Sequence, residues 1–150
     1  MSDSLFTKAG LDSMLQRIES LRPDSPRQWG KMTLPQMLAH CQPPLRVAMG
    51  ELPLKRSLIG FLFGRMAKRK LLSPEPWKHG MPTAPEFRVT DLRDFAKEKS
   101  ALIELARRFG ERGPAALGSH VHPFFGPLTP NEWHALQWRH LDHHLRQFGA

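Results

Sequence analysis

Residues 129–148 read TPNEWHALQWRHLDHHLRQF and predict a long amphipathic helix. Thr129-Pro130-Asn131-Glu132 is a helix start, because threonine is a good N-cap, glutamate three residues later completes a capping box, and proline suits the first helical position. At 100° per residue, His140 and His144 lie about 40° apart on the face that carries the large apolar side chains. The predicted helix therefore has two histidines at the centre of its buried face.

Three further segments show apolar residues at helical spacing. They lie near residues 8–22, from Thr33 onward, and from an N-cap at Asp91 to a stop at Gly110, with Leu92 on the apolar face of the last. Pro43–Pro44 should interrupt the second segment, because proline cannot continue the helical hydrogen-bond ladder.

The expected fold is all-α. Four main helices are joined by long connections over residues 73–90 and 111–128, and no strand alternation or internal repeat appears. This pattern predicts an antiparallel four-helix bundle with long crossover loops, in one domain over residues 1–150.

Composition and charge exclude several classes of protein. The 150 residues carry 22 Lys and Arg against 14 Asp and Glu, a formal charge of +8, and 40% apolar residues exclude a disordered chain. The single cysteine excludes an internal disulfide and fits a reducing compartment. The N-terminal MSDSLFTKAG lacks a signal-peptide pattern, and no apolar run is long enough to span a bilayer. A cytoplasmic protein is expected.

The basic excess gathers around residues 55–70, where Lys and Arg bracket the apolar run 58–63. We expect a core helix with a solvated basic end, in which Leu58, Leu62 and Phe63 are buried. The alternative is an amphipathic segment that contacts a membrane or a partner. Nucleic-acid binding is disfavoured, because no zinc-finger, Walker or aromatic-interleaved RNA motif accompanies the charge.

Two histidines at positions i and i+4 on a buried face can converge on one metal ion. Hydrogen bonds to side chains or water would also satisfy their nitrogens, so both interpretations stay open on this spacing alone. A third ligand must come from elsewhere. His40 is the best candidate, although it lies about 120° from the apolar centre of its own helix, and His120 and His122 compete with it.

Three blocks of the sequence resemble the DinB/YfiT-like superfamily, and most closely an uncharacterised bacterial branch known only as a domain of unknown function. The blocks are QWGKMT at 28–33 running into QMLAHC at 36–41, HPFFGPLTP at 122–130, and HLDHHLRQF at 140–148. The resemblance implies a four-helix bundle that holds a divalent metal, usually nickel or zinc, through His40, His140 and His144. It also implies a relation to transferases and isomerases that use low-molecular-weight thiols such as bacillithiol, mycothiol or glutathione.

The leading hypothesis is therefore a metal-dependent enzyme of the thiol-transferase type. The residues expected to orient the ligands or to line the cavity are His122, Trp133, Gln147, Trp29 and Phe124. No catalytic residue is assigned, and the substrate and a homodimer stay open. The alternatives are a non-catalytic metal-binding or stress-associated interaction protein and a basic peripheral protein that contacts membrane or nucleic acid. With histidine pKa values near 6.5, metal affinity should fall between about pH 7 and pH 5.

Overall fold

The structure is a computed structural model that describes residues 4–150; the first three residues of the N-terminal stretch considered above lie outside it. Its described residues form helices and connecting segments without a β-strand, which confirms the all-α class. The helices are α1 Lys8–Ser20, α2 Leu34–His40, α3 Gln42–Ala48, α4 Leu58–Leu71, α5 Phe95–Arg112 and α6 Pro130–Gln147, with short 3-10 turns η1 Pro85–Phe87 and η2 Gly113–Ala116.

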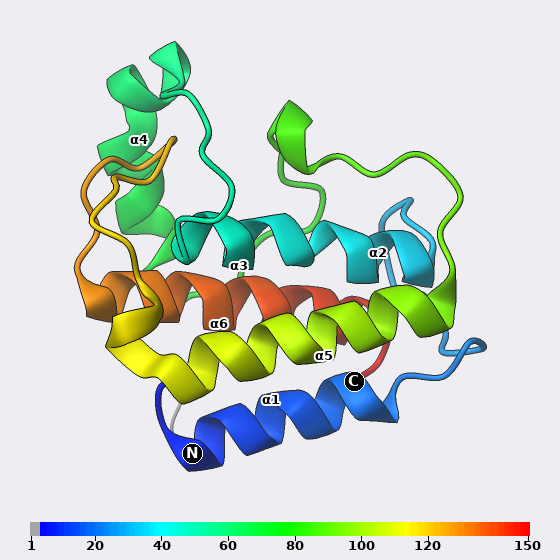
Figure 1. Cartoon of the computed structure of the whole chain (residues 1–150). Helices are drawn as coiled ribbons and strands as arrows, with labels where there is room; N and C mark the ends of the chain where they lie inside the picture. Colours follow the sequence, from blue (N-terminus) through cyan, green and yellow to red (C-terminus); the bar gives the residue numbers. More distant parts are fainter. Residues whose placement is uncertain (1–3) are drawn as a thin grey trace.

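The long helices lie lengthwise beside one another (Figure 1), with α5 against α1, α2 and α3, and α6 against α1 and α3. Their facing sides make one apolar core, in which Met14 and Ile18 of α1 meet Leu102 and Phe109 of α5, all fully buried. Helix α4 stands across one end of this layer. The core thus joins segments that are far apart in the sequence.

The expected interruption at Pro43–Pro44 is confirmed, and it separates α2 from α3. Thr33 and Gln36 form the capping box that starts α2, and α2 ends at His40. Cys41 lies between the two helices, and proline occupies the first turn of α3, where its missing N–H costs no hydrogen bond. The break follows His40 and does not change its position on the wheel of α2. Ala39 and His40 are buried as well as Leu34, Met37 and Leu38, so α2 is covered on more than one side and its apolar stripe does not show where His40 lies.

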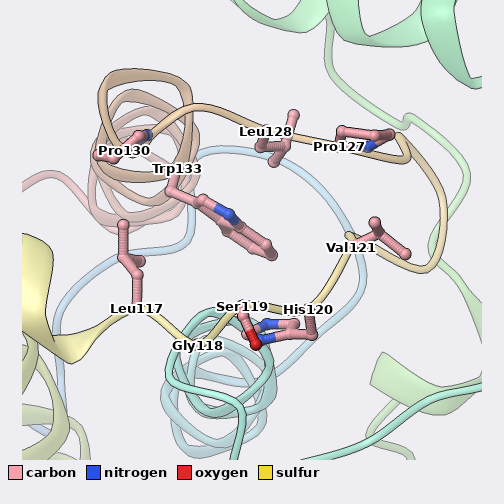
Figure 2. A pocket seen from close by; sticks show the side chains of 9 residues that line it. All are labelled: Leu117, Gly118, Ser119, His120, Val121, Pro127, Leu128, Pro130 and Trp133. Carbon is pink, nitrogen blue, oxygen red and sulfur yellow. The ribbon is translucent and has the colours of Figure 1, made fainter.

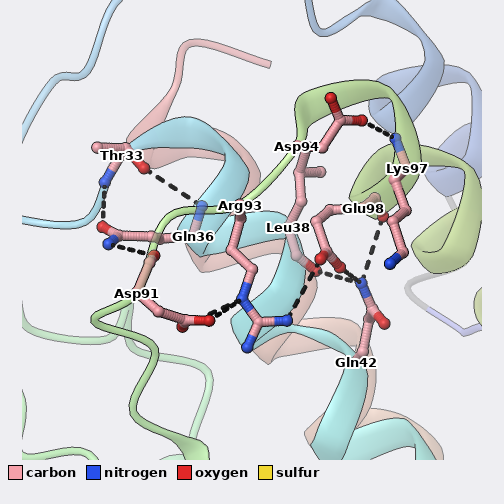
Figure 3. Close-up of polar contacts among 9 residues, drawn as sticks. All are labelled: Thr33, Gln36, Leu38, Gln42, Asp91, Arg93, Asp94, Lys97 and Glu98. Carbon is pink, nitrogen blue, oxygen red and sulfur yellow. Dashed lines mark hydrogen bonds and ion pairs between the residues drawn. The ribbon is translucent and has the colours of Figure 1, made fainter.

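A polar network joins the start of α5 to α2 and α3 (Figure 3). Buried Glu98 accepts hydrogen bonds from Gln42 at 2.7 Å and from Arg93 at 3.3 Å. Gln36 donates from its amide to the Asp91 carbonyl at 3.1 Å. A buried carboxylate needs such partners, because leaving one unpaired is costly. The network therefore fixes the α2–α3 corner, and with it His40, against α5.

Two expectations for α5 are wrong. The N-cap is Asp94, which accepts from the Lys97 amide at 2.7 Å, and Leu92 is 99% exposed ahead of the helix. Gly110 does not end the helix either. It is buried inside α5, where a Cβ would lie 2.6 Å from Leu11 Cδ1, so this glycine allows the close approach of α1.

The expectation that α4 is a core helix is also wrong. Leu58 is 77% exposed, Leu62 67% and Phe63 55%, and the buried residues of α4 are Gly60 and Gly64. The inward face of α4 carries glycines because the backbone of the 122–126 turn passes against it. No helix within residues 4–150 has the length and hydropathy needed to cross a membrane.

Candidate metal centre

Three histidine side chains from α2 and α6 meet in the interior. His40 and His140 are 100 residues apart in the sequence, and their Nε2 atoms lie 3.0 Å apart. The His144 ring lies 4.7 Å from that of His40 and 4.8 Å from that of His140, between ring centres. One possible ligand atom of each histidine lies within 4.8 Å of those of the other two. If all three atoms bound one ion at about 2.1 Å, they would lie about 3–4 Å apart, so the cluster is somewhat wider than a filled site. The expected convergence is present.

The backbone fixes the tautomer of His40. Its Nδ1 lies 2.7 Å from the carbonyl oxygen of Phe87, which can only accept, so Nδ1 carries the hydrogen. His40 Nε2 therefore presents a lone pair, and the short contact makes His140 Nε2 the donor between the two rings. His140 Nδ1 is then buried without a hydrogen-bond partner among residues 4–150.

Gln147 orients His144 from the last turn of α6. The Gln147 amide nitrogen donates to the Trp29 carbonyl at 2.9 Å, which fixes which end of the amide is oxygen. That oxygen lies 2.8 Å from His144 Nδ1 and accepts its hydrogen. His144 Nε2 is consequently the nitrogen left free for a ligand role, the arrangement usual for metal-binding histidines.

Burial keeps all three imidazoles neutral. Desolvation lowers the pKa of His40, lowers that of His140 well below its usual value, and lowers that of His144 to about 3. Mutual repulsion of the charged forms adds to the shift at His140 and His144. Neutral imidazole is the form that binds a metal, so the three rings need no deprotonation at neutral pH.

The sequence matches the family described as "Protein of unknown function (DUF1569)" over residues 3–150. The chain belongs to the DUF1569 family. Searches of curated proteins and of solved structures found no match. The expected match to a domain of unknown function is thus confirmed. The function of the DUF1569 chain must be argued from its own residues.

His122 and Trp133 do not lie at the histidine cluster. His122 Nδ1 accepts two backbone N–H bonds, from Phe124 at 3.0 Å and Phe125 at 3.2 Å, so it holds the 122–126 turn together. Trp133 lies about two turns of α6 before His140. Its ring faces a pocket beside His120 (Figure 2), whose walls come from residues 117–133.

Phe124 also serves the fold, because its backbone receives Gly60 and Gly64 of α4. Asp142 pairs with Arg17 at 2.8 Å and with Arg146 at 2.9 Å, outside the histidine cluster. Cys41 is buried, and burial raises the pKa of its thiol, so it is an inert apolar residue.

Sequence reasoning missed an aromatic group beside the cluster. The Trp29 ring, an expected lining residue, stacks on His79 at 3.8 Å between ring centres, and His143 lies 5.6 Å from Trp29. The Trp77 ring lies 6.1 Å from that of His140. Trp77 and His79 belong to the 73–90 connection, whose unusual length was the one available signal. Trp77 and His143 thus lie next to the histidine cluster, and Trp29 and His79 lie next to His143.

Proposed function

We propose that this DUF1569 chain binds one divalent metal ion through His40, His140 and His144. The observation that carries the proposal is the pair of oriented imidazoles, His40 on Phe87 and His144 on Gln147, each with its Nε2 left for a ligand. Histidines that only filled a core would not need two separate hydrogen bonds that each leave Nε2 as the nitrogen available to a ligand.

The residues fit a cation by their chemistry. Only one hydrogen can lie between the facing Nε2 atoms of His40 and His140. A cation in place of that hydrogen would take a lone pair from each ring and from His144. Three neutral nitrogen ligands suit zinc or nickel better than magnesium or calcium, which prefer oxygen.

We also propose that the fold is the DinB/YfiT-like four-helix bundle that the sequence resembles. Helices α1, α5 and α6, with α2 and α3 as one broken helix, would be its four members. The support is that α6 and the end of α2 supply the ligand set which the resemblance implies, and that these helices lie lengthwise together (Figure 1).

The reaction proposed is transfer or activation of a low-molecular-weight thiol. A bound divalent cation with three histidine ligands keeps coordination positions open and lowers the pKa of a thiol or water placed there. Trp77 lies beside His140 and His143 beside His144, and both would limit the access of water to a bound substrate. Thiol-dependent turnover by the metal-loaded chain tests this step; metal binding without turnover would favour the non-catalytic alternative.

The orienting role of Gln147 gives a direct test of metal binding. In Gln147→Leu, His144 loses the acceptor that fixes its tautomer, and affinity for nickel or zinc should fall by about 10–100-fold. Isothermal titration of the untagged chain measures this. Gln16→Leu, the same change at an exposed position of α1, should leave affinity unchanged. Equal affinities in Gln147→Leu and in the unaltered chain would show that the amide does not serve a metal ligand.

A further inference from the structure

Helix α4 exposes an apolar surface of unusual size. Six of its large apolar side chains are between 55% and 77% exposed: Leu58, Ile59, Phe61, Leu62, Phe63 and Met66. With about 200 Å² per phenylalanine, Phe61 and Phe63 alone leave about 250 Å² uncovered. The four aliphatic side chains take the total beyond the few hundred Å² that soluble monomers normally expose. We call these six residues the α4 apolar surface.

The orientation of α4 is specified, so this exposure is not a consequence of loose packing. Gly60 and Gly64 are buried on the 122–126 turn, where added Cβ atoms would lie 2.7 Å and 2.1 Å from the Phe124 carbonyl oxygen. Lys68 pairs with Glu132 of α6 at 3.0 Å, and the Ser57 amide donates to the Pro123 carbonyl at 3.1 Å. Only the glycine face can turn inward, and the apolar side chains are held outward.

Basic residues surround the α4 apolar surface, and no acidic residue occurs between positions 52 and 74. The basic residues are Lys55, Arg56, Arg65, Lys68, Arg69 and Lys70. Within residues 4–150, Lys68 is the member of this group that forms an ion pair. The first two turns of α4 are thus apolar and its last two are mainly basic, and the helix is reached from solvent at one end of the molecule (Figure 1).

The α4 apolar surface and the basic residues around it together indicate the kind of partner that α4 would bind. A second copy of the chain would bring two such basic groups together on molecules that each carry a formal charge of +8. A nucleic acid would neutralise the charge but leave the apolar side chains in water. An anionic lipid bilayer satisfies both, since acyl chains take up Leu, Ile, Phe and Met while the headgroups bind Lys and Arg. We propose that α4 is an interfacial helix that docks this protein on anionic membranes.

Vesicle co-sedimentation of the full chain tests the proposal. The chain should sediment with vesicles of phosphatidylcholine and phosphatidylglycerol, and far less with vesicles of phosphatidylcholine alone. The double variant Phe61→Ser, Leu62→Ser should bind the anionic vesicles at least about tenfold more weakly. Leu92→Ser, at a fully exposed leucine outside α4, should bind like the unaltered chain. Arg69→Glu with Lys70→Glu should also weaken binding, because it reverses charge that meets the headgroups.

Three results would overturn the proposal. The first is no binding of the unaltered chain to the anionic vesicles. The second is equal binding by the Phe61→Ser, Leu62→Ser variant, which would make the contact electrostatic only. The third is a dimer in solution that this double variant converts to a monomer, since the α4 apolar surface would then be an interface between copies. The variant should keep its affinity for nickel or zinc, so membrane docking and metal binding fail or stand separately.

Discussion

Nickel or zinc is expected to raise the melting temperature of the metal-free chain at pH 7.5 by about 5–10 °C. An ion that binds only the folded state stabilises it by RT ln(1 + [L]/Kd), about 2.7 kcal/mol at one hundred times Kd. For a chain of this length, each kcal/mol corresponds to a few degrees. The ion should bind only the folded state, because the proposed ligands come from α2 and α6, two segments 100 residues apart that unfolding separates. Differential scanning fluorimetry with and without the ion measures it.

Two single substitutions sharpen this experiment. His144→Ala removes a proposed ligand and should abolish the metal-induced shift. His134→Ala should keep it, because the His134 ring packs on Phe6 at 5.1 Å between ring centres and takes no part in the cluster. The shift is measured for each variant with and without metal, so a lower melting temperature of the metal-free variant does not affect the result. Equal loss of the shift in both variants would contradict the assignment of ligands.

Burial changes the pH range expected for metal binding. The expected fall in metal affinity between about pH 7 and pH 5 assumed a histidine pKa near 6.5. In the folded chain the pKa of His144 is about 3, and the pKa values of His40 and His140 are also lowered. Protons therefore compete with the metal only at lower pH. The shift in melting temperature should be largely retained at pH 5.

The metal-free chain should lose stability as the pH falls from 6.5 to 5, and His122 is one cause. Its pKa is lowered to about 3, first by burial and then by the neighbouring His120. The unfolded chain, with a histidine pKa near 6.5, binds the proton first, so acid favours unfolding. The contribution of His122 is about 1.6 kcal/mol over this range, because the unfolded histidine is half protonated at pH 6.5 and the full slope of about 1.4 kcal/mol per pH unit applies only below its pKa. Most carboxylates titrate below this pH range.

His122→Asn separates this contribution from the others. The asparagine oxygen can still accept the backbone hydrogens of Phe124 and Phe125 that His122 Nδ1 accepts, but it does not titrate. Urea unfolding at pH 6.5 and pH 5 should show a smaller loss of unfolding free energy in the variant, by about 1.6 kcal/mol. An identical loss in both proteins would mean that His122 does not stay neutral in the folded chain.

Local signals predicted much of the fold and the position of two of the three proposed ligands. The capping box at Thr129 and the 3.6-residue period place His140 and His144 on the buried face of α6, because neither depends on distant residues. His40 was harder. Its side chain lies about 120° from the apolar stripe of α2, but α2 is buried on that side too, and the wheel of a single segment does not show a second buried face.

The incorrect predictions concern segments whose structure is determined by a tertiary contact. Gly110 predicts a helix end by its propensity, but the approach of α1 requires a glycine within α5. The apolar run 58–63 is typical of a core segment, yet the spacing of Gly60 and Gly64 decides which face turns inward. Asp91 and Asp94 are both good N-caps, and the network around Glu98 selects the second. The Phe87 carbonyl that orients His40 has no sequence signal, since any residue supplies a carbonyl.

The metal content of the chain, purified without a histidine tag and dialysed after incubation with nickel or zinc, tests the central claim most directly. We predict close to one ion per chain by inductively coupled plasma mass spectrometry, and almost none in His140→Ala, whose lost ring faces both other ligands. An unaltered, folded chain that retains no ion, or a His140→Ala variant that retains as much as the unaltered chain, would contradict the account.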